Sequence, residues 1–289
     1  MANLYYLSSR GKKFNLLSFE SAKLQAAKFH SVKWNPEVIK RRYGSRVSRM
    51  TKDSQTFPCT FKFKGNPAKR KQQIDALIYE TEWDCFHETP GKIYWNDQYI
   101  DVFLTVHDTY PDGLGLSYTT LEASFFAPYP FWIEELLITL RPSGGSTGEF
   151  AADVKGYPAT RSYKYGYTYS YPYSPLATYF DVDSPLDAEF MAVCYGPANN
   201  VTFYINGHKY QVNRTLRANQ VMIIDTREIT PPEKRCYVIY ENGTEVNCFN
   251  DRAVDSPLFT PISGGSAVIN YSRGFGIDLT IFQERSAPV

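Results

Sequence analysis

The chain lacks a long apolar segment. Its 289 residues contain no run approaching the roughly 18 apolar residues that a membrane helix needs. The first ten residues, Met1 to Arg10, hold no apolar core of signal-peptide length. The sequence therefore predicts a protein with no membrane insertion, made and kept in the cytosol until it is released by other means.

Cysteine and histidine are scarce and are not spaced for metal binding. The five cysteines include no Cys-x-x-Cys pair, and the four histidines are scattered along the chain. We expect reduced, buried thiols and no metal site. Only Cys236 and Cys248 lie close in sequence. A two-residue turn at Asn242-Gly243 would pair Cys236 with Phe249 and put the two sulfurs on opposite faces. This register excludes a disulfide bridge between Cys236 and Cys248 unless a β-bulge changes the alignment of the strands.

Signatures of catalysis are also missing. Gly11-Lys12 and Gly91-Lys92 lack the upstream glycine and the following hydroxyl of a phosphate-binding loop. Gly264-Gly265-Ser266 lacks the last glycine of a nucleophile elbow and precedes an expected strand. His87-Glu88 begins like a zinc-binding helix, but no second histidine follows. We therefore expect no enzyme, no catalytic residue and no cofactor.

Aromatic residues, in contrast, are abundant. They make up 16% of the chain, led by 23 tyrosines and 19 phenylalanines, which favour half-buried strands. The composition predicts an all-β protein with one helix. Asn66 can cap that helix, Pro67 suits its first position, and Ile74, Leu77 and Ile78 share one apolar stripe.

Three turns predict β-hairpins with sensible cross-strand pairs. The turns are Asn96-Asp97, Asn206-Gly207 and Asn242-Gly243. The first would pair Ile93 with Ile100, and the second Phe203 with Tyr210. Further strands are expected at 57–64, 116–126, 177–181, 189–195, 221–225, 267–271 and 277–282.

The pattern loosens in the middle of the chain. A Gly/Ser-rich stretch runs from Arg141 to Gly148, and a tyrosine-rich stretch follows it. We place an N-terminal domain at 1–133, a linker at 134–175 and a C-terminal domain at 176–289. Alternate residues of the linker are tyrosines, so an extended segment would present them on one face. They are Tyr163, Tyr165, Tyr167, Tyr169, Tyr171 and Tyr173.

This tyrosine face has three open interpretations. It can pack on its own domain, bury at a subunit contact or stack on sugars. Tyr165, Tyr167 and Tyr169 are its candidate interface residues.

Charge is unevenly distributed along the chain. Residues 1–71 hold 17 basic and three acidic groups, a net +14, and the remainder carries a net −13. Such asymmetry indicates nucleic acid or an acidic protein surface as a partner, or simply a solvated strand face.

The order of several motifs resembles one known family. Val32-Lys33-Trp34-Asn35-Pro36 precedes a basic strand, and Pro130-Phe131-Trp132 closes the N-terminal half. Gly196-Pro197-Ala198-Asn199-Asn200, the Asn206-Gly207 turn and Ile277-Asp278-Leu279 follow in the C-terminal third. In this order the chain resembles the distal tail proteins of long-tailed phages, the siphovirus-type hub of the baseplate.

The resemblance implies an architecture and a set of partners. The N-terminal β-sandwich or split barrel would close a hexameric ring, and a galectin-like β-sandwich would follow it. The ring would lie at the virion tail tip and join the tail tube protein to a tail-tip (tail-associated) protein and the receptor-binding protein. DNA would pass through its lumen.

A channel through which DNA passes should not bind that DNA tightly. Each phosphate contact with Lys or Arg adds affinity for DNA, so a basic lining would hold it. We therefore expect no stable nucleic-acid binding. We hypothesise that most residues of one basic cluster face acidic surfaces of neighbouring proteins and not the DNA channel. The cluster comprises Lys40, Arg41, Arg42, Arg46 and Arg49.

Two other classes of function remain open. One is a carbohydrate-binding β-sandwich for host-surface glycans, although the C-terminal half contains no tryptophan. The other is nucleic-acid binding through residues 1–71, which have few interleaved aromatic residues.

Overall fold

The computed structural model describes residues 3–110, 117–142, 177–227 and 235–289. The chain forms two compact units. Unit 1 comprises Met1–Glu134 and Arg285–Val289, and unit 2 comprises Glu135–Glu284. The boundaries fall within β10 (Trp132–Leu140) and at the end of β19 (Gly276–Arg285). The expected linker therefore begins inside a strand, and its residues from 143 onward lie outside the described ranges.

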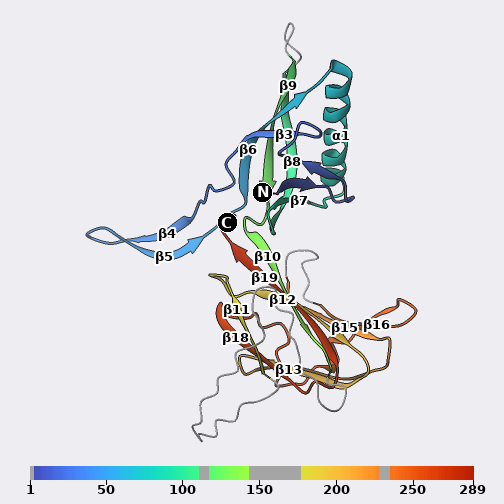
Figure 1. The fold of residues 1–289 in the computed structure, drawn as a ribbon. Helices are drawn as coiled ribbons and strands as arrows, with labels where there is room; N and C mark the ends of the chain where they lie inside the picture. Colours follow the sequence, from blue (N-terminus) through green and yellow to red (C-terminus); the bar gives the residue numbers. More distant parts are fainter. Residues whose placement is uncertain (1–2, 111–116, 143–176, 228–234) are drawn as a thin grey trace, which may run out of the picture. The chain divides into compact units, whose positions relative to one another are not determined.

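Unit 1 consists of antiparallel strands and one helix (Figure 1). Its strands are β1 (Leu4–Leu7), β2 (Lys13–Asn15), β3 (Lys23–Ala27), β4 (Asn35–Lys40), β5 (Ser45–Thr51), β6 (Gln55–Lys64), β7 (Gly91–Trp95), β8 (Gln98–Tyr110) and β9 (Tyr118–Ala127). Apart from β4 and β5, they pair in the order β2-β1-β7-β8-β9-β6-β3. The long β8 pairs with β7 through its first residues and with β9 through its later ones. It thus connects two sheets, and Tyr6 and Phe125 from these sheets meet in the core with ring centroids 6.1 Å apart.

The helix of unit 1, α1 (Pro67–Phe86), begins as the sequence predicts. The Asn66 side chain accepts a hydrogen bond from the backbone N–H of Lys69 at 2.7 Å, which satisfies one of the unpaired donors of the first turn. Ile74 and Leu77 are buried, and Ile78 packs against the core beside them. The predicted apolar stripe is therefore the side of α1 that faces the sheets.

The same helix also buries two carboxylates that the apolar pattern did not reveal. Asp84 accepts hydrogen bonds from the Tyr6 hydroxyl and, at 3.0 Å, from the Ser9 backbone N–H. Glu80 accepts from the Ser8 hydroxyl at 3.0 Å. These bonds attach the loop after β1 to the helix and offset the cost of burying the acids.

Unit 2 is a β-sandwich of two antiparallel sheets. One sheet has the order β17-β16-β15-β12-β19-β10, and the other β11-β18-β13-β14. The strands not yet bounded are β11 (Ala177–Val182), β12 (Glu189–Tyr195), β13 (Ala198–Ile205), β14 (His208–Leu216), β15 (Val221–Asp225), β16 (Arg235–Ile239), β17 (Glu245–Asn247) and β18 (Gly265–Tyr271), with a short 3-10 helix η1 (Phe249–Asp251).

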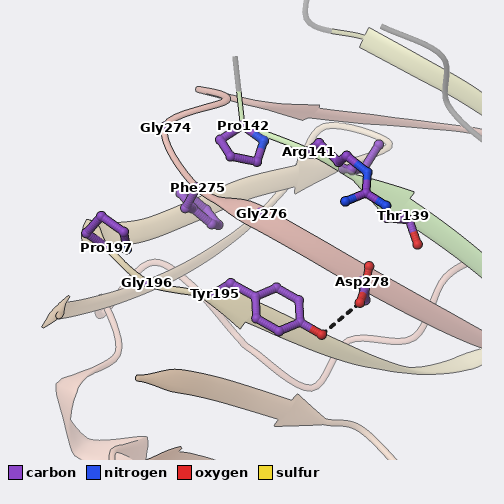
Figure 2. A pocket seen from close by; sticks show the side chains of 11 residues that line it. Thr139, Arg141, Pro142, Tyr195, Gly196, Pro197, Gly274, Phe275, Gly276 and Asp278 are labelled. Carbon is purple, nitrogen blue, oxygen red and sulfur yellow. Dashed lines mark hydrogen bonds between the residues drawn. The ribbon is translucent and has the colours of Figure 1, made fainter. Parts of the chain in front are cut away.

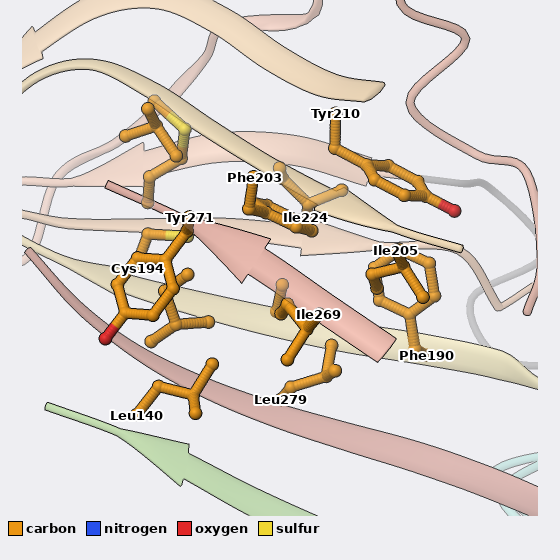
Figure 3. Packing of buried hydrophobic residues seen from close by; sticks show 14 of the residues in the cluster. Leu140, Phe190, Cys194, Phe203, Ile205, Tyr210, Ile224, Ile269, Tyr271 and Leu279 are labelled. Atoms are coloured by element: carbon orange, nitrogen blue, oxygen red, sulfur yellow. The ribbon is translucent and has the colours of Figure 1, made fainter. Parts of the chain in front are cut away.

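Alternate residues of both sheets of unit 2 fill one core (Figure 3). Phe190 and Ile224 come from one sheet, and Phe203, Tyr210 and Ile269 from the other. All five are at most 1% exposed. This burial of one face of each sheet is what the alternating sequence pattern predicts.

Two of the three predicted hairpins have the predicted register. Ile93 pairs with Ile100 around Asn96-Asp97, and Phe203 with Tyr210 around Asn206-Gly207. In the second turn both Asn206 and Gly207 have positive φ, at 51° and 81°, as a tight two-residue hairpin turn requires.

The register predicted for the third hairpin, β16–β17, is wrong. Tyr237 pairs with Asn247 and Ile239 with Glu245, which is one residue away from the expected alignment. The turn uses three residues, closed by a hydrogen bond from the Gly243 N–H to the Tyr240 carbonyl oxygen at 2.9 Å. Gly243 takes φ +79°, which a glycine adopts at little cost. The added turn residue moves Cys248 to the position opposite Cys236.

Candidate assembly surface: the β4–β5 hairpin

The most unusual surface of unit 1 is the hairpin formed by β4 and β5. Within the described part of the chain these strands pair only with each other. Figure 1 shows them extending away from the other strands of unit 1. Every residue from Pro36 to Met50 is exposed, although most other strands of the unit bury one side.

The base of the hairpin is fixed by aromatic contacts. Trp34 lies edge-on to Phe131, with ring centroids 6.4 Å apart. The Lys52 ammonium lies 4.1 Å from the centre of the Phe131 ring, and the lysine donates a hydrogen bond to the Pro130 carbonyl oxygen. Trp132, next in sequence, is 1% exposed in the core. The Trp34 and Pro130-Phe131-Trp132 motifs therefore meet, and together they connect the hairpin to the core.

One side of the hairpin is apolar. Directly paired residues of an antiparallel ladder point to the same side. Pro36 pairs with Met50 and Val38 with Val47, so all four share one side. Val38, Val47 and Met50 are each about half exposed, at 50%, 51% and 50%. We call these four residues the apolar side.

The opposite side and the tip carry most of the positive charge. Arg46 pairs with Ile39 and Arg49 with Glu37, so these arginines lie opposite the apolar side. Arg41 and Arg42 lie in the turn, where the Arg41 N–H donates to the Gly44 carbonyl oxygen at 3.0 Å. Lys40 ends β4 on the side of Val38. The structure thus brings all five sequence-predicted basic residues onto one hairpin, and none of them forms an ion pair with a described residue.

A two-stranded hairpin with both faces in water has little to stabilise it. An isolated ribbon is marginally stable at best, and its two free edges can pair with other strands. The clustered valine and methionine side chains of the apolar side add a patch of the kind that marks interaction sites. The chemistry of this hairpin therefore fits a protein surface that offers an apolar contact and acidic groups.

The other candidate interface residues, Tyr165, Tyr167 and Tyr169, lie outside the described residues. Unit 2 contains a different feature that no sequence pattern indicates, a pocket of about 570 Å³ between the ends of β10, β12 and β19 (Figure 2). Phe275, Pro142 and Pro197 line it together with Arg141.

The chemistry of the pocket centres on one tyrosine and one carboxylate. The Tyr195 hydroxyl donates to Asp278 at 2.8 Å, and this hydrogen bond, followed by partial burial, raises the pKa of the tyrosine. Tyr195 is 41% exposed and can contact a ligand. A ring beside a carboxylate and a guanidinium is a set of groups that can bind the face and the hydroxyls of a sugar.

The described residues provide neither a cluster of metal-ligating side chains nor a membrane-spanning helix. They contain no group of three or more His, Cys, Asp or Glu side chains placed to hold a metal ion. Among the same residues no helix is long and apolar enough to cross a membrane.

Comparison with known proteins identifies the fold. No known family model matches the sequence, and no curated protein matches it. The structure is similar to the crystal structure of the SPP1 Dit protein, described as a paradigm of the hub adsorption apparatus in phages that infect Gram-positive bacteria. The TM-score is 0.61 with 8% identity, and the match covers 99% of both chains.

A chain of the phage P2 baseplate, in its activated conformation with Ca, matches with a TM-score of 0.62 and 12% identity over 100% of both chains. The same baseplate with Sr gives the same values. Identities this low show the fold alone. The chain therefore has the fold of a phage Dit hub protein and of a phage baseplate chain.

Proposed function

We propose that this chain is a structural hub protein of a phage tail, located in the virion at the tail tip. The observation that carries the proposal is the full-length match to a Dit hub protein and to a baseplate chain. A match of one unit alone would indicate only a common β-sandwich. Here both units match in one chain, with almost no residues left over on either side.

The hairpin supports assembly of the hub as a ring. In a ring each subunit presents one surface to the next and a different surface to the previous one. The apolar side is such a surface, since nothing in the described chain covers it and a neighbouring copy would remove it from water. A ring of six follows from the resemblance to the distal tail family.

The basic side fits acidic partners in the same assembly. Residues 72–289 carry a net −13, so neighbouring copies already offer negative charge, and the tail tube protein is a second acceptor. Arg46 and Arg49 would face these partners and leave the lumen free for DNA to pass. The tail-tip protein and the receptor-binding protein would attach elsewhere on the ring.

Light scattering of the purified chain over a range of concentrations tests the ring. We expect a species near six times 33.1 kDa, seen as ring particles by electron microscopy. The variant Val47→Asp should give monomers, because it places a charge in the buried contact. The matched control is Val254→Asp, which changes a fully exposed valine of unit 2 and should leave the ring intact. Rings that persist in Val47→Asp would contradict the role of the apolar side.

Charge reversal tests the orientation of the basic side. The double variant Arg46→Glu, Arg49→Glu should weaken docking to the tail tube in a co-sedimentation assay. It should leave DNA passage unaffected in those particles that do assemble. Normal docking combined with lost DNA passage would show instead that these arginines line the lumen.

Glycan binding is a second candidate function, favoured by the pocket around Tyr195 and Asp278. A glycan array probed with the wild-type chain should give binding that Tyr195→Ala abolishes. Tyr179→Ala, at a tyrosine that is 68% exposed on β11, is the matched control. An array with no ligand for the wild type would remove this candidate.

A further inference from the structure

We propose that Cys236 and Cys248 are a cross-linking site that closes as an intramolecular disulfide when the reduced chain meets an oxidant. Their sulfur atoms are 3.2 Å apart. Bonded sulfurs lie about 2.05 Å apart, so the two atoms need to approach by only about 1 Å. Both cysteines are free thiols in the structure.

The backbone around the pair suits a disulfide. Tyr237 pairs with Asn247, and the Cys248 N–H donates to the Cys236 carbonyl oxygen at 2.9 Å, so the two cysteines lie directly opposite each other. Opposed residues of an antiparallel ladder have Cα atoms about 5.5 Å apart when hydrogen-bonded, within the range that disulfides span. The three-residue turn that ends in Gly243 produces this alignment. Bond formation therefore requires side-chain adjustment and no change of register.

The two thiols differ in a way that assigns their roles. The hydrogen bond between the two thiols holds the pKa of Cys248 below its ordinary value despite burial, and the charge of Arg214 adds to the effect. The hydrogen bond to Cys248 and burial raise the pKa of Cys236. Cys248 is therefore the attacking thiolate and Cys236 the thiol that completes the bond.

The chemistry balances with a small disulfide such as oxidised glutathione as the oxidant. The Cys248 thiolate attacks one sulfur of the oxidant, and the first glutathione thiolate leaves. Cys236 then loses its proton and attacks the Cys248 sulfur, and the second glutathione leaves. Two protein thiols are oxidised to one disulfide, and the oxidant is reduced to two thiols that take up the two protons.

Access to the buried pair comes through the edge of the sheet. Both cysteines are 1% exposed, so the oxidant reaches them only when the hairpin opens locally. β17 is three residues long and is the last strand of its sheet, which makes this opening one of the less costly ones in unit 2. Oxidation should consequently be slow and should then hold the edge strand in place.

The biological timing rests on the proposed function, whereas the chemistry does not. A tail protein is made in a reducing cytoplasm and works outside the cell, in an oxidising medium. The cross-link would then form in released virions and stabilise unit 2 where no repair is available. Absence of a ring in light scattering would count against self-assembly of the hub in solution and leave the disulfide chemistry standing.

The test uses the full chain in a Cys85→Ser background, because Cys85 is exposed and would link chains to each other. The reduced protein is incubated with oxidised glutathione, denatured, alkylated and digested with trypsin. No Lys or Arg lies between Arg235 and Arg252, so one tryptic peptide carries both cysteines. We expect that peptide to become about 2 Da lighter and to escape alkylation, since two hydrogens are lost.

Cys236→Ser should abolish this product and accumulate a glutathione adduct on Cys248, while the control Cys59→Ser should still form it. Because a core serine can impair folding, a second measurement uses the unmutated pair. The oxidised protein should melt several degrees higher than the reduced one, and added reductant should remove the difference. A peptide that remains fully alkylated after prolonged oxidation of folded protein would overturn the proposal, as would a stable glutathione adduct with both cysteines present.

Discussion

The hairpins β4–β5 and β13–β14 have similar lengths, and each reverses through a turn that ends in a glycine with positive φ. Ile205 of β13 is 2% exposed, whereas Ile39 of β4 is 57% exposed. Both sequences place apolar residues on the strands, yet among the described residues only β13–β14 has a second sheet to pack against. A stretch of apolar strand residues therefore indicates that a surface will be buried, but not which molecule buries it.

Truncating the two isoleucines gives the largest expected contrast. Ile205→Ala should lower the free energy of unfolding by about 2–5 kcal/mol, because it removes methyl groups from a closed core. Ile39→Ala should change it by less than about 0.5 kcal/mol, since the side chain is mostly in water. Guanidinium titration followed by circular dichroism measures both. A large loss for Ile39→Ala would mean that the free chain already buries this hairpin.

The stability contributed by tyrosines of the β13–β14 and β4–β5 hairpins should respond differently to alkaline pH. Burial raises the pKa of Tyr210 on β14, so the fold favours its neutral form. This contribution is fully present below the unfolded tyrosine pKa of about 10 and is lost as pH rises above it, by about 1.4 kcal/mol at pH 11.

Tyr210→Phe removes this titration together with the hydrogen bond to the Thr260 carbonyl oxygen. The stability difference between wild type and variant should therefore shrink from pH 8 to pH 11. The control is Tyr43→Phe at the tip of β4–β5, where the side chain is 84% exposed. Parallel pH profiles for wild type and Tyr210→Phe would contradict this account.

The smallest contrast concerns the turn glycines. Gly207 and Gly44 have φ of +81° and +77°, and an added Cβ would meet no atom within 4 Å in either turn. Alanine there costs only the backbone penalty of about 1 kcal/mol. Gly207→Ala should lower the stability of unit 2 by that amount in chemical denaturation.

Gly44→Ala should instead leave the unfolding of unit 1 unchanged, because the β4–β5 hairpin contributes little to its core. Tryptophan fluorescence reports on this unit, since all four tryptophans lie in it. The same variant should weaken ring formation, since the strained turn makes the hairpin form less often. Equal losses of stability for Gly207→Ala and Gly44→Ala would contradict the difference proposed between the two hairpins.

Local sequence patterns were sufficient for much of the fold. The cap at Asn66, the Asn206-Gly207 turn and the alternation in β12 and β15 each depend on residues within a few positions of one another. The short strands β1, β2 and β3 were not predicted, because short segments carry too weak a pattern. The β4–β5 hairpin was expected only as a single basic strand. The basic residues of the candidate surface were found by charge, but their hairpin was not.

The third hairpin shows why register is harder to predict than strand position. A turn of two or three residues is compatible with the same Asn242-Gly243 dipeptide, and each choice reverses which residues face the core. In the structure Cys236, Val238 and Cys248 face the core, and each is 1% exposed. The two cysteines therefore lie on the same face of the hairpin, contrary to the prediction.

The sequence by itself determined the all-β class, the single helix, two hairpin registers and the concentration of positive charge in residues 1–71, because these follow from composition and near neighbours. Only the tertiary structure decided that Trp34 meets Phe131, that Asp84 accepts from Tyr6, that Cys236 faces Cys248 and that Tyr195 and Asp278 line a pocket. Except for the cysteines, these contacts join residues far apart in the chain. No local pattern encodes them, because they result from how whole sheets pack, and the cysteine contact was fixed by the core that those sheets enclose.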